Sequence, residues 1–239
     1  MSELNQFGQP VGDRVDHWIP ARTPSGQLMR GRWCSLVPLD AELHSRELYT
    51  ANAEDLDDRR WTYLPYGPFA DAEAYREWVT QVAGRDDPMF FAIVDGTGQA
   101  GGVAAYQRID PLAGTIEVGH LCFSSRLQGT TAATEAMVLM MRTAFDELGF
   151  RRYEWKCDEL NNPSRNAAER LGFTYEGTFR QATVVKGRNR DTSWYALTDD
   201  DWRILRPVYE QWLGPANFDK QGVQRQPLRG LISVARGRG

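Results

Sequence analysis

Residues 126–133 read RLQGTTAA and stand between a segment of strand character, 115–123, and a long amphipathic segment. The small residues around Gly129 let successive backbone N–H groups converge in a turn. A helix that begins at this turn adds the positive end of its dipole, so the turn suits a diphosphate. It is neither a P-loop, which ends in Gly-Lys-Ser/Thr, nor a dinucleotide fingerprint, because Gly129 is its only glycine. The stretch predicts a strand, an anion-binding turn and a helix in succession.

The segment after this turn carries apolar residues at the spacing of one helical face. They are Ala133, Ala136, Met137, Met140, Met141, Ala144, Phe145 and Leu148. Such a stripe predicts a helix with one buried face, which Gly149 closes as a left-handed cap. The methionines are core residues in this interpretation.

The flanking sequence alternates between helix and strand patterns. Helices are expected at 41–53, with Asp40 as N-cap, and at 71–84. Strands separated by glycine and proline turns are expected at 33–39, 89–94, 102–109 and 115–123, of which the last three form an antiparallel meander. Downstream, the patterns predict a half-buried strand at 152–158, a short helix from Asn162 to Leu171, strands at 174–185 and 191–197, and a helix at 199–212.

No internal repeat interrupts this series, which predicts one mixed α/β domain over residues 32–213. Residues 1–31 are rich in glycine, proline and polar residues and are expected to form an irregular arm. Residues 214–239 are expected to form a basic tail, because five basic residues and no acidic residue follow position 219. The tail could contact RNA or a partner protein, or simply be solvated.

The composition narrows the class of protein. With 32 acidic and 28 basic residues, general nucleic-acid binding is not expected. No apolar run approaches the roughly 18 to 20 residues that span a bilayer, and residues 1–9 do not resemble a secretion signal, so a soluble, cytoplasmic protein is expected. Cys34, Cys122 and Cys157 are widely spaced and odd in number, which predicts small buried residues and neither a disulfide nor a metal site.

Two motifs in this order resemble the GNAT superfamily of N-acetyltransferases. Residues 117–135 resemble its fourth strand, pyrophosphate loop and third helix, whose loop pattern is Q/R-x-x-G-x-G/A. Arg126, Gln128 and Gly129 match that pattern, whereas Thr131 stands where the family has glycine or alanine. Backbone must approach the phosphates closely at that position.

The second motif points to one branch of the family. Asn161 and Ser164, followed by residues 171–173 (Leu-Gly-Phe), resemble the N-x-x-S helix and Gly-Phe ending of the branch that includes the ribosomal-protein acetyltransferases RimJ and RimL. Together the two motifs, with the order of elements around them, cover roughly residues 32–202. The resemblance implies the GNAT fold, a mixed, mostly antiparallel seven-stranded sheet that splays between its fourth and fifth strands and is flanked by helices.

The resemblance also implies acetyl-CoA as the cofactor. Its pantetheine arm would lie between strands 115–123 and 152–158, and its diphosphate on the amides of the loop. The implied cofactor contacts are Leu121, Cys122, Phe123, Arg126, Gln128, Gly129, Thr130, Thr131, Ala132, Ala133, Asn161 and Ser164.

In enzymes of this family the amine attacks the thioester directly in a ternary complex, so Cys122 is not expected to be a nucleophile. Proton transfer is still required, because an ammonium has no lone pair and a thiolate leaves better when protonated. Other branches of the family use a tyrosine as the acid at the position where this chain has Ala168. Ser164 is therefore the candidate acid here. Alternatively, Ser164 only satisfies backbone groups in the first turn of the helix.

Two residues of the strand at 115–123 are candidates for the base. Glu117 lies on the strand that approaches the thioester. His120 would face the opposite side of a regular strand, unless a bulge turns it. Each of the two residues could instead be a structural polar group. In that case a relay of water molecules to bulk solvent would take up the proton.

The acceptor pocket is expected between the loop after the first helix and the last hairpin. Aromatic walls from Tyr63, Tyr66 and Phe69 could hold a cationic amine together with Asp191, although each could also serve packing or local ion pairing. The expected acceptor is a primary amine, either a protein N-terminus or a small molecule. A longer or acidic acyl donor such as succinyl-CoA, and a catalytically silent CoA-binding module, are alternatives, and a homodimer is left open.

Overall fold

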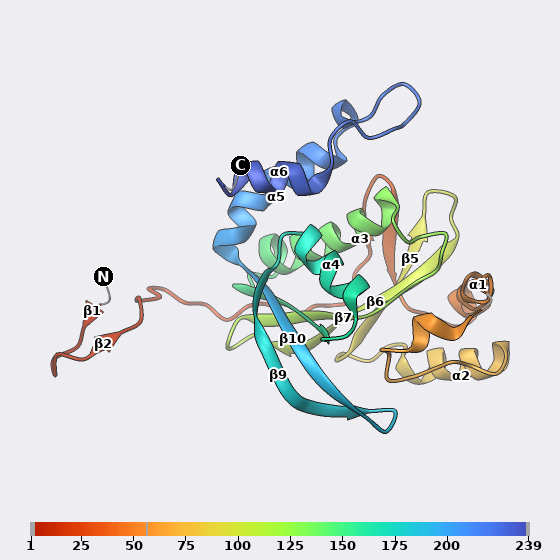
Figure 1. Cartoon of the computed structure of the whole chain (residues 1–239), viewed down its shortest axis with the longest axis horizontal. Helices are drawn as coiled ribbons and strands as arrows, with labels where there is room; N and C mark the ends of the chain where they lie inside the picture. The colour runs from red at the N-terminus through yellow and green to blue at the C-terminus, as the bar shows by residue number, and fades with distance from the viewer. Residues whose placement is uncertain (1–2, 56, 238–239) are drawn as a thin grey trace.

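The computed structural model describes residues 3–55 and 57–237. A central sheet has the strand order β3-β4-β5-β6-β7-β8-β10-β9 (Figure 1). Its strands are β3 (Met29–Arg30), β4 (Cys34–Pro38), β5 (Met89–Asp95), β6 (Ala100–Asp110), β7 (Thr115–Phe123), β8 (Arg152–Asp158), β9 (Thr174–Val185) and β10 (Arg188–Thr198). All neighbouring strands are antiparallel except β7 and β8, which are parallel. The expected mixed sheet is confirmed, and β3 adds a two-residue edge strand to the seven that were expected.

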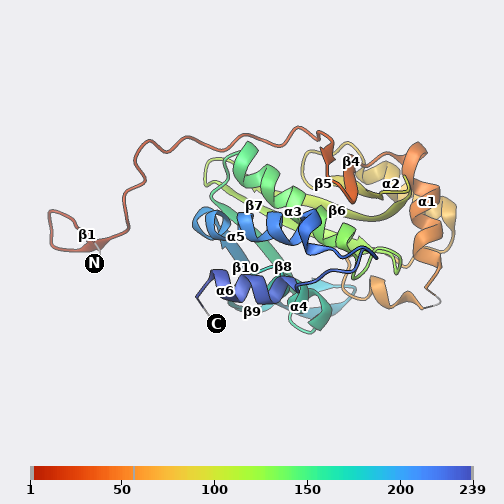
Figure 2. The ribbon, with the colours of Figure 1, turned by 90° about the horizontal axis from the view of Figure 1, so that it is seen from above.

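Helices cover both faces of this sheet (Figures 1 and 2). They are α1 (Ala41–Ala53), α2 (Ala72–Val82), α3 (Thr131–Arg142), α4 (Asn162–Arg170), α5 (Asp199–Leu213) and α6 (Leu228–Ala235). The first two helices begin at the side-chain caps Asp40 and Asp71, each of which accepts a backbone N–H three residues on. Short 3-10 turns occupy Asp58–Trp61 and Pro215–Asn217.

Strand alternation divides the interior into two hydrophobic cores. Phe91 and Tyr106 face the layer of α3 and α5. Their neighbours Phe90 and Ala105 face α1 and α2, where Val79 is fully buried. All three cysteines are free and buried, as expected.

Two helix boundaries differ from expectation. The stripe at 133–148 forms α3 and then a single π-helical turn, Thr143–Glu147, which places Phe145 in a stack on Trp202. Helix α4 is capped by Asn161 and not Asn162, because the Asn161 carboxamide accepts the backbone N–H of Ser164.

The N-terminal arm joins the domain earlier than position 32. The hairpin of β1 (Glu3–Leu4) and β2 (Pro10–Val11) lies away from the body (Figures 1 and 2). From Ala21 onward, however, the chain is tied to the domain through backbone bonds to Pro111 and Leu148.

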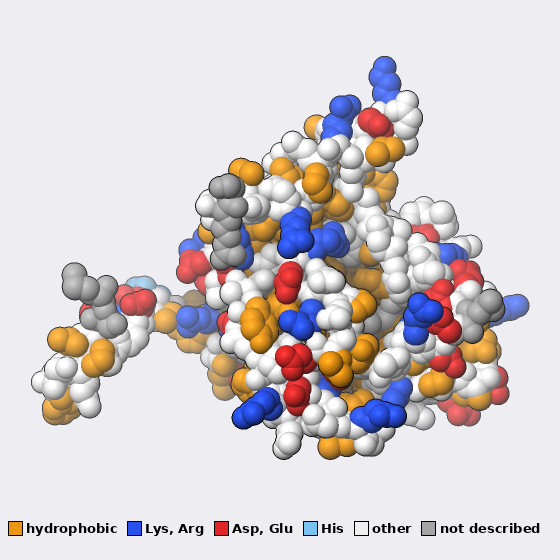
Figure 3. Space-filling model, viewed as in Figure 1, with side chains coloured by type: hydrophobic (Ala, Val, Ile, Leu, Met, Phe, Trp, Pro, Cys, Tyr) orange, Lys and Arg blue, Asp and Glu red, His pale blue; other side chains and the backbone are white. Residues whose placement is uncertain are grey.

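The C-terminal segment is more ordered than a tail. Leu228 and Ile232 lie four residues apart on one face of α6 and are buried in the core beside α5. The basic tail expected over residues 214–239 is therefore not loose at Leu228–Ala235, which form α6. Basic side chains do project from the loop beyond α5 (Figure 3). Within the described residues no helix is both long and apolar enough to cross a membrane.

Candidate active site

Strands β7 and β8 separate halfway along their length. They pair from Thr115 and Arg152 up to Val118 and Trp155, and beyond that point each strand continues without the other. The residues between Gly119 and Phe123 therefore border an opening in the sheet, as the resemblance implied.

A bulge interrupts β7 at the opening. Ala105 of β6 pairs with Gly119 while Val103 pairs with Cys122, so β7 carries one extra residue. His120 lies in the bulge with a left-handed φ of +52°. As a result, both Glu117 and His120 line one cavity of about 670 Å³, although a regular strand would place them on opposite faces.

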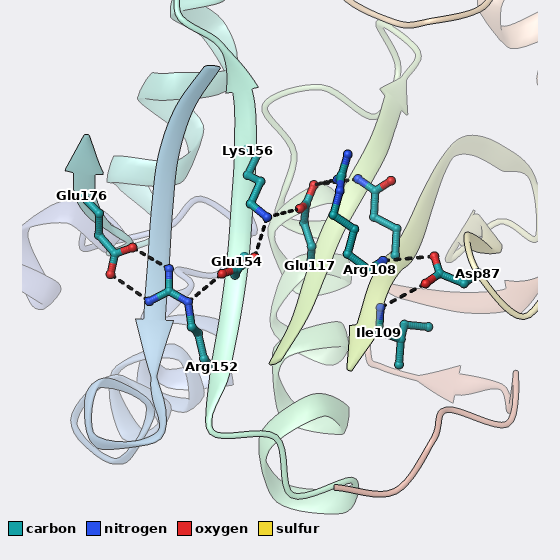
Figure 4. A network of polar contacts seen from close by, with 9 residues as sticks. Asp87, Arg108, Ile109, Glu117, Arg152, Glu154, Lys156 and Glu176 are labelled. Carbon is teal, nitrogen blue, oxygen red and sulfur yellow. Dashed lines mark hydrogen bonds and ion pairs between the residues drawn. The ribbon is translucent and has the colours of Figure 1, made fainter. Parts of the chain in front are cut away.

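Glu117 is held at the wall of this cavity by three donors (Figure 4). Its side chain is 1% exposed, and its Oε1 accepts from Gln107 Nε2 and Arg108 Nη1, each at 2.7 Å. Its Oε2 lies 3.0 Å from Lys156 Nζ. Gly119 makes this arrangement possible, because a Cβ there would collide with the Gln107 side chain. Burial raises the pKa of Glu117, and the nearby Lys156 and Arg108 oppose that rise.

Lys156 is a residue of the site that the sequence pattern did not single out. Its ammonium bridges Glu117 and Glu154 and lies 3.7 Å from the ring centroid of Trp194. The ion-pair series continues through Glu154 to Arg152 and then to Glu176 at the edge of the sheet (Figure 4). The alternation in β8 suggested a solvated side chain, but the Lys156 side chain is only 10% exposed and lies against the Trp194 ring of β10.

The His120 ring stacks on Tyr66 and contacts the tilted ring of Phe90. Its ring lies 5.6 Å from that of Tyr66, nearly parallel to it, and 4.8 Å from that of Phe90. Burial, aided by Arg108, lowers the pKa of His120 to about 4, so the imidazole is neutral at pH 7. Its Nδ1 is buried without a hydrogen-bond partner among the described residues.

The aromatic residues expected in the acceptor pocket are placed differently from one another. Tyr63 lines the cavity and donates through its hydroxyl to the Leu160 carbonyl. Tyr66 and Phe69 instead pack with Trp78 in the core beneath α1 and α2. They support the wall from behind and do not line the cavity.

Asp191 also lies outside the cavity lining. It accepts the backbone N–H of Gln181 at 2.7 Å and the Asn189 carboxamide at 2.9 Å. These hydrogen bonds lower the pKa of Asp191. They also link β9 and β10 at the point where the register between the two strands shifts.

Ser164, at the start of α4, lines the cavity opposite β7. Its Oγ accepts the indole N–H of Trp155 at 2.9 Å. A hydroxyl that accepts in this way keeps its own proton available for donation. Asn161 also lines the cavity and fixes the backbone of Ser164 as the cap of α4.

The turn before α3 presents unpaired backbone donors. In the part of the chain that the structure describes, the N–H groups of Gly129, Thr131 and Ala132 have no protein acceptor. Thr130 caps α3 by accepting the Ala133 N–H. Gly129 has a left-handed φ of +73° and open space where a Cβ would stand.

Other expected cofactor residues are engaged within the protein. The backbone N–H groups of Gln128 and Thr130 donate to carbonyl groups within the turn. The backbone donors that stay free are therefore those of Gly129, Thr131 and Ala132. The Gln128 side chain donates to the Phe123 carbonyl, and Arg126 contacts Gln99 and Glu54. Burial raises the pKa of the Cys122 thiol to about 12, which agrees with the expectation that it is no nucleophile.

Three orphaned amides at a helix N-terminus, beside an opening in the sheet, fit the diphosphate of a CoA thioester. Comparison with known proteins agrees with this assignment. Residues 35–174 match the acetyltransferase (GNAT) domain family. A crystal structure of a GCN5-related N-acetyltransferase from Brucella melitensis is 42% identical, with a TM-score of 0.89, and the match covers 92% of this chain and 100% of that chain.

Two bacterial relatives are also similar. YdaF of Bacillus subtilis (strain 168) is 28% identical over 172 residues, which cover 70% of this chain and 90% of YdaF. The ribosomal-protein-serine acetyltransferase of Escherichia coli (strain K12) is 32% identical over 99 residues, which cover 41% of this chain and 55% of that protein.

The fold and the site together define a transferase that takes an acyl group from a CoA thioester. The chain belongs to the GNAT family of acetyltransferases. It is an N-acetyltransferase that depends on acetyl-CoA.

Proposed function

We propose that this enzyme acetylates a primary amine, either a protein N-terminus or a small molecule, by direct attack in a ternary complex. The observation that carries the proposal is the position of the cavity. It begins where β7 and β8 separate, and Glu117, His120 and Ser164 all line it. The name of the E. coli relative refers to a ribosomal protein, which favours a protein N-terminus as the acceptor.

The amides of Gly129, Thr131 and Ala132 would hold the diphosphate, aided by the dipole of α3. The backbone from Leu121 to Phe123 borders the opening in which the pantetheine arm would lie. When bound, acetyl-CoA supplies the thioester that an amine can attack.

The proton donor in this proposal is Ser164. Because Trp155 donates to its Oγ, the hydroxyl can donate its own proton, either to the neighbouring Cys157 sulfur or to an acceptor in the cavity. A leaving thiolate beside α4 would be that acceptor.

The proton acceptor in this proposal is Glu117. Burial raises its pKa, whereas the pKa of His120 is lowered to about 4, so the carboxylate is the better base at neutral pH. Neutral His120 would accept a hydrogen bond from the amine and orient it.

Replacing Ser164 by alanine tests this assignment. We expect kcat to fall by about 100-fold, the lower end for loss of a general acid, while KM for acetyl-CoA changes less than about threefold, because the free amides at α3 are untouched. Thiol release measured over a panel of primary amines gives both constants.

Two further variants separate chemistry from packing. Ser164→Thr keeps a hydroxyl and should recover part of kcat, and Ser25→Ala changes an exposed serine of the arm and should match the wild type. An unchanged kcat in Ser164→Ala would remove the serine from the mechanism. A wild-type enzyme that releases no thiol with any amine would refute the proposed function as a whole.

A further inference from the structure

The cavity beside Glu117 contains more hydrogen-bond donors than acceptors. Four of its lining side chains are cationic, namely Arg60, Arg108, Lys156 and Arg190, and two are carboxylates, Glu117 and Asp158. Both carboxylates are engaged. Glu117 accepts from Arg108, Gln107 and Lys156, and Asp158 accepts the Leu160 backbone N–H at 2.9 Å.

Arg190 is the cation without a counter-ion. Over residues 3–55 and 57–237, its side chain forms no ion pair or hydrogen bond, and its Nε is buried. It projects from β10, on the wall formed by the last hairpin. The side chain as a whole is half-buried, but its Nε is shielded from solvent and has no acceptor, which is costly, so an anionic partner at this position would satisfy it.

Two more buried donors face the same cavity. The Arg60 side chain is 6% exposed, and although it pairs with Asp55 and Asn52, its Nε has no hydrogen-bond partner among the described residues. Trp194, which lines the cavity from β10, likewise has a buried indole N–H without an acceptor. Strand β10 and the 3-10 turn Asp58–Trp61 thus both contribute side chains with unsatisfied N–H groups to the lining of one cavity.

We propose that this cavity binds an acidic group, a carboxylate or phosphate, carried by one of the two reactants, with Arg190 as its main partner and Arg60 as the second. A planar guanidinium offers paired N–H donors that match the oxygens of either group. The inference rests on the proposed function and adds a substrate class to it: the reactant pair carries an amine, which meets Glu117, and an acid, which meets Arg190.

The acid has two sources, and two arms of one experiment separate them. In the acceptor arm, acetyl-CoA is combined with matched amines: peptides that differ only by Glu or Gln at the second position, and O-phosphoethanolamine against ethanolamine. In the donor arm, one neutral amine is combined with acetyl-CoA or succinyl-CoA. Each arm is run with the wild type, Arg190→Gln, Arg190→Lys and the control Arg188→Gln, which alters an exposed arginine of the same strand outside the cavity.

In one of the two arms we expect the wild type to prefer the acidic reactant by about 10- to 100-fold in kcat/KM, the size of a charge-assisted bond. Arg190→Gln should lose that preference through KM, with the neutral reactant unaffected, and Arg190→Lys should retain part of it. Equal use of acidic and neutral reactants in both arms would overturn the inference.

Calorimetry tests whether the cavity binds an acidic group, and it does so without turnover. The wild type should bind the acidic peptide, O-phosphoethanolamine or succinyl-CoA more tightly than its neutral counterpart, and Arg190→Gln should not. If no amine is acylated but this difference persists, the proposed function fails and the acidic site stands. Equal affinities for acidic and neutral ligands would refute the acidic site even in an active enzyme.

Discussion

Replacing Lys156 by methionine is expected to destabilise the fold by about 3 to 5 kcal/mol, the usual result of removing one partner from a buried ion pair. Glu117 is 1% exposed and would keep Arg108 as its one cationic neighbour, while Glu154 would lose the same ammonium. Urea unfolding at pH 7 measures the change. Lys220→Met, at an exposed lysine, is the control and should unfold like the wild type.

The pH dependence of this loss has a defined sign. The pKa of Glu117 is already raised in the folded state and should rise further without Lys156. A raised carboxyl pKa means that the native state takes up a proton more readily than the unfolded chain, so the destabilisation is largest at high pH and shrinks as the pH falls.

A second variant links this destabilisation to the carboxylate. Glu117→Gln in the Lys156→Met background should restore part of the stability, because it removes a buried charge that has lost one of its two cationic partners. Equal stability of Lys156→Met and wild type at pH 7 would show that the ion pair between Lys156 and Glu117 does not stabilise the fold.

Replacing Gly129 by glutamate is expected to lower kcat/KM for acetyl-CoA by at least about 100-fold. The new side chain has space, but its carboxylate would stand beside the free amides of Thr131 and Ala132 and repel the diphosphate. The left-handed φ of +73° adds backbone strain. Thiol release at saturating amine measures the effect.

Gly129→Asn separates charge from strain. Asparagine tolerates the left-handed conformation and carries no charge, so most of the activity should remain. If Gly129→Glu kept kcat/KM within threefold of the wild type, the diphosphate would not lie on this turn.

The sheet and the cofactor turn could be predicted because their signals are local. Residues 115–123 form β7 with the expected bounds, and a turn around Gly129 leads directly into the amphipathic α3. Asp40 caps α1 as expected, since a cap depends on only three or four neighbouring residues. The second helix was expected to begin at 71, and Asp71 is instead the cap of α2.

The walls of the cavity depend on contacts distant in sequence, which no local pattern encodes. Lys156 alternates like a solvated residue of β8, yet Trp194 of β10 covers it. Asp191 looked available for a cationic substrate, but a register shift in the last hairpin engages it with Gln181. Likewise, Leu228 and Ile232 follow a polar, glycine-containing stretch that suggested a free tail, and only α5 gives them a surface to cover.

The proposed cofactor site depends on the three free amides around the start of α3, which would bind the diphosphate of CoA. Calorimetric titration of the wild-type protein with CoA and, in parallel, with pantetheine tests it most directly, because pantetheine lacks the diphosphate. We expect one CoA bound per chain, with an affinity at least about 100-fold higher than that for pantetheine. Equal affinities for the two ligands, or no heat of binding with CoA, would contradict it.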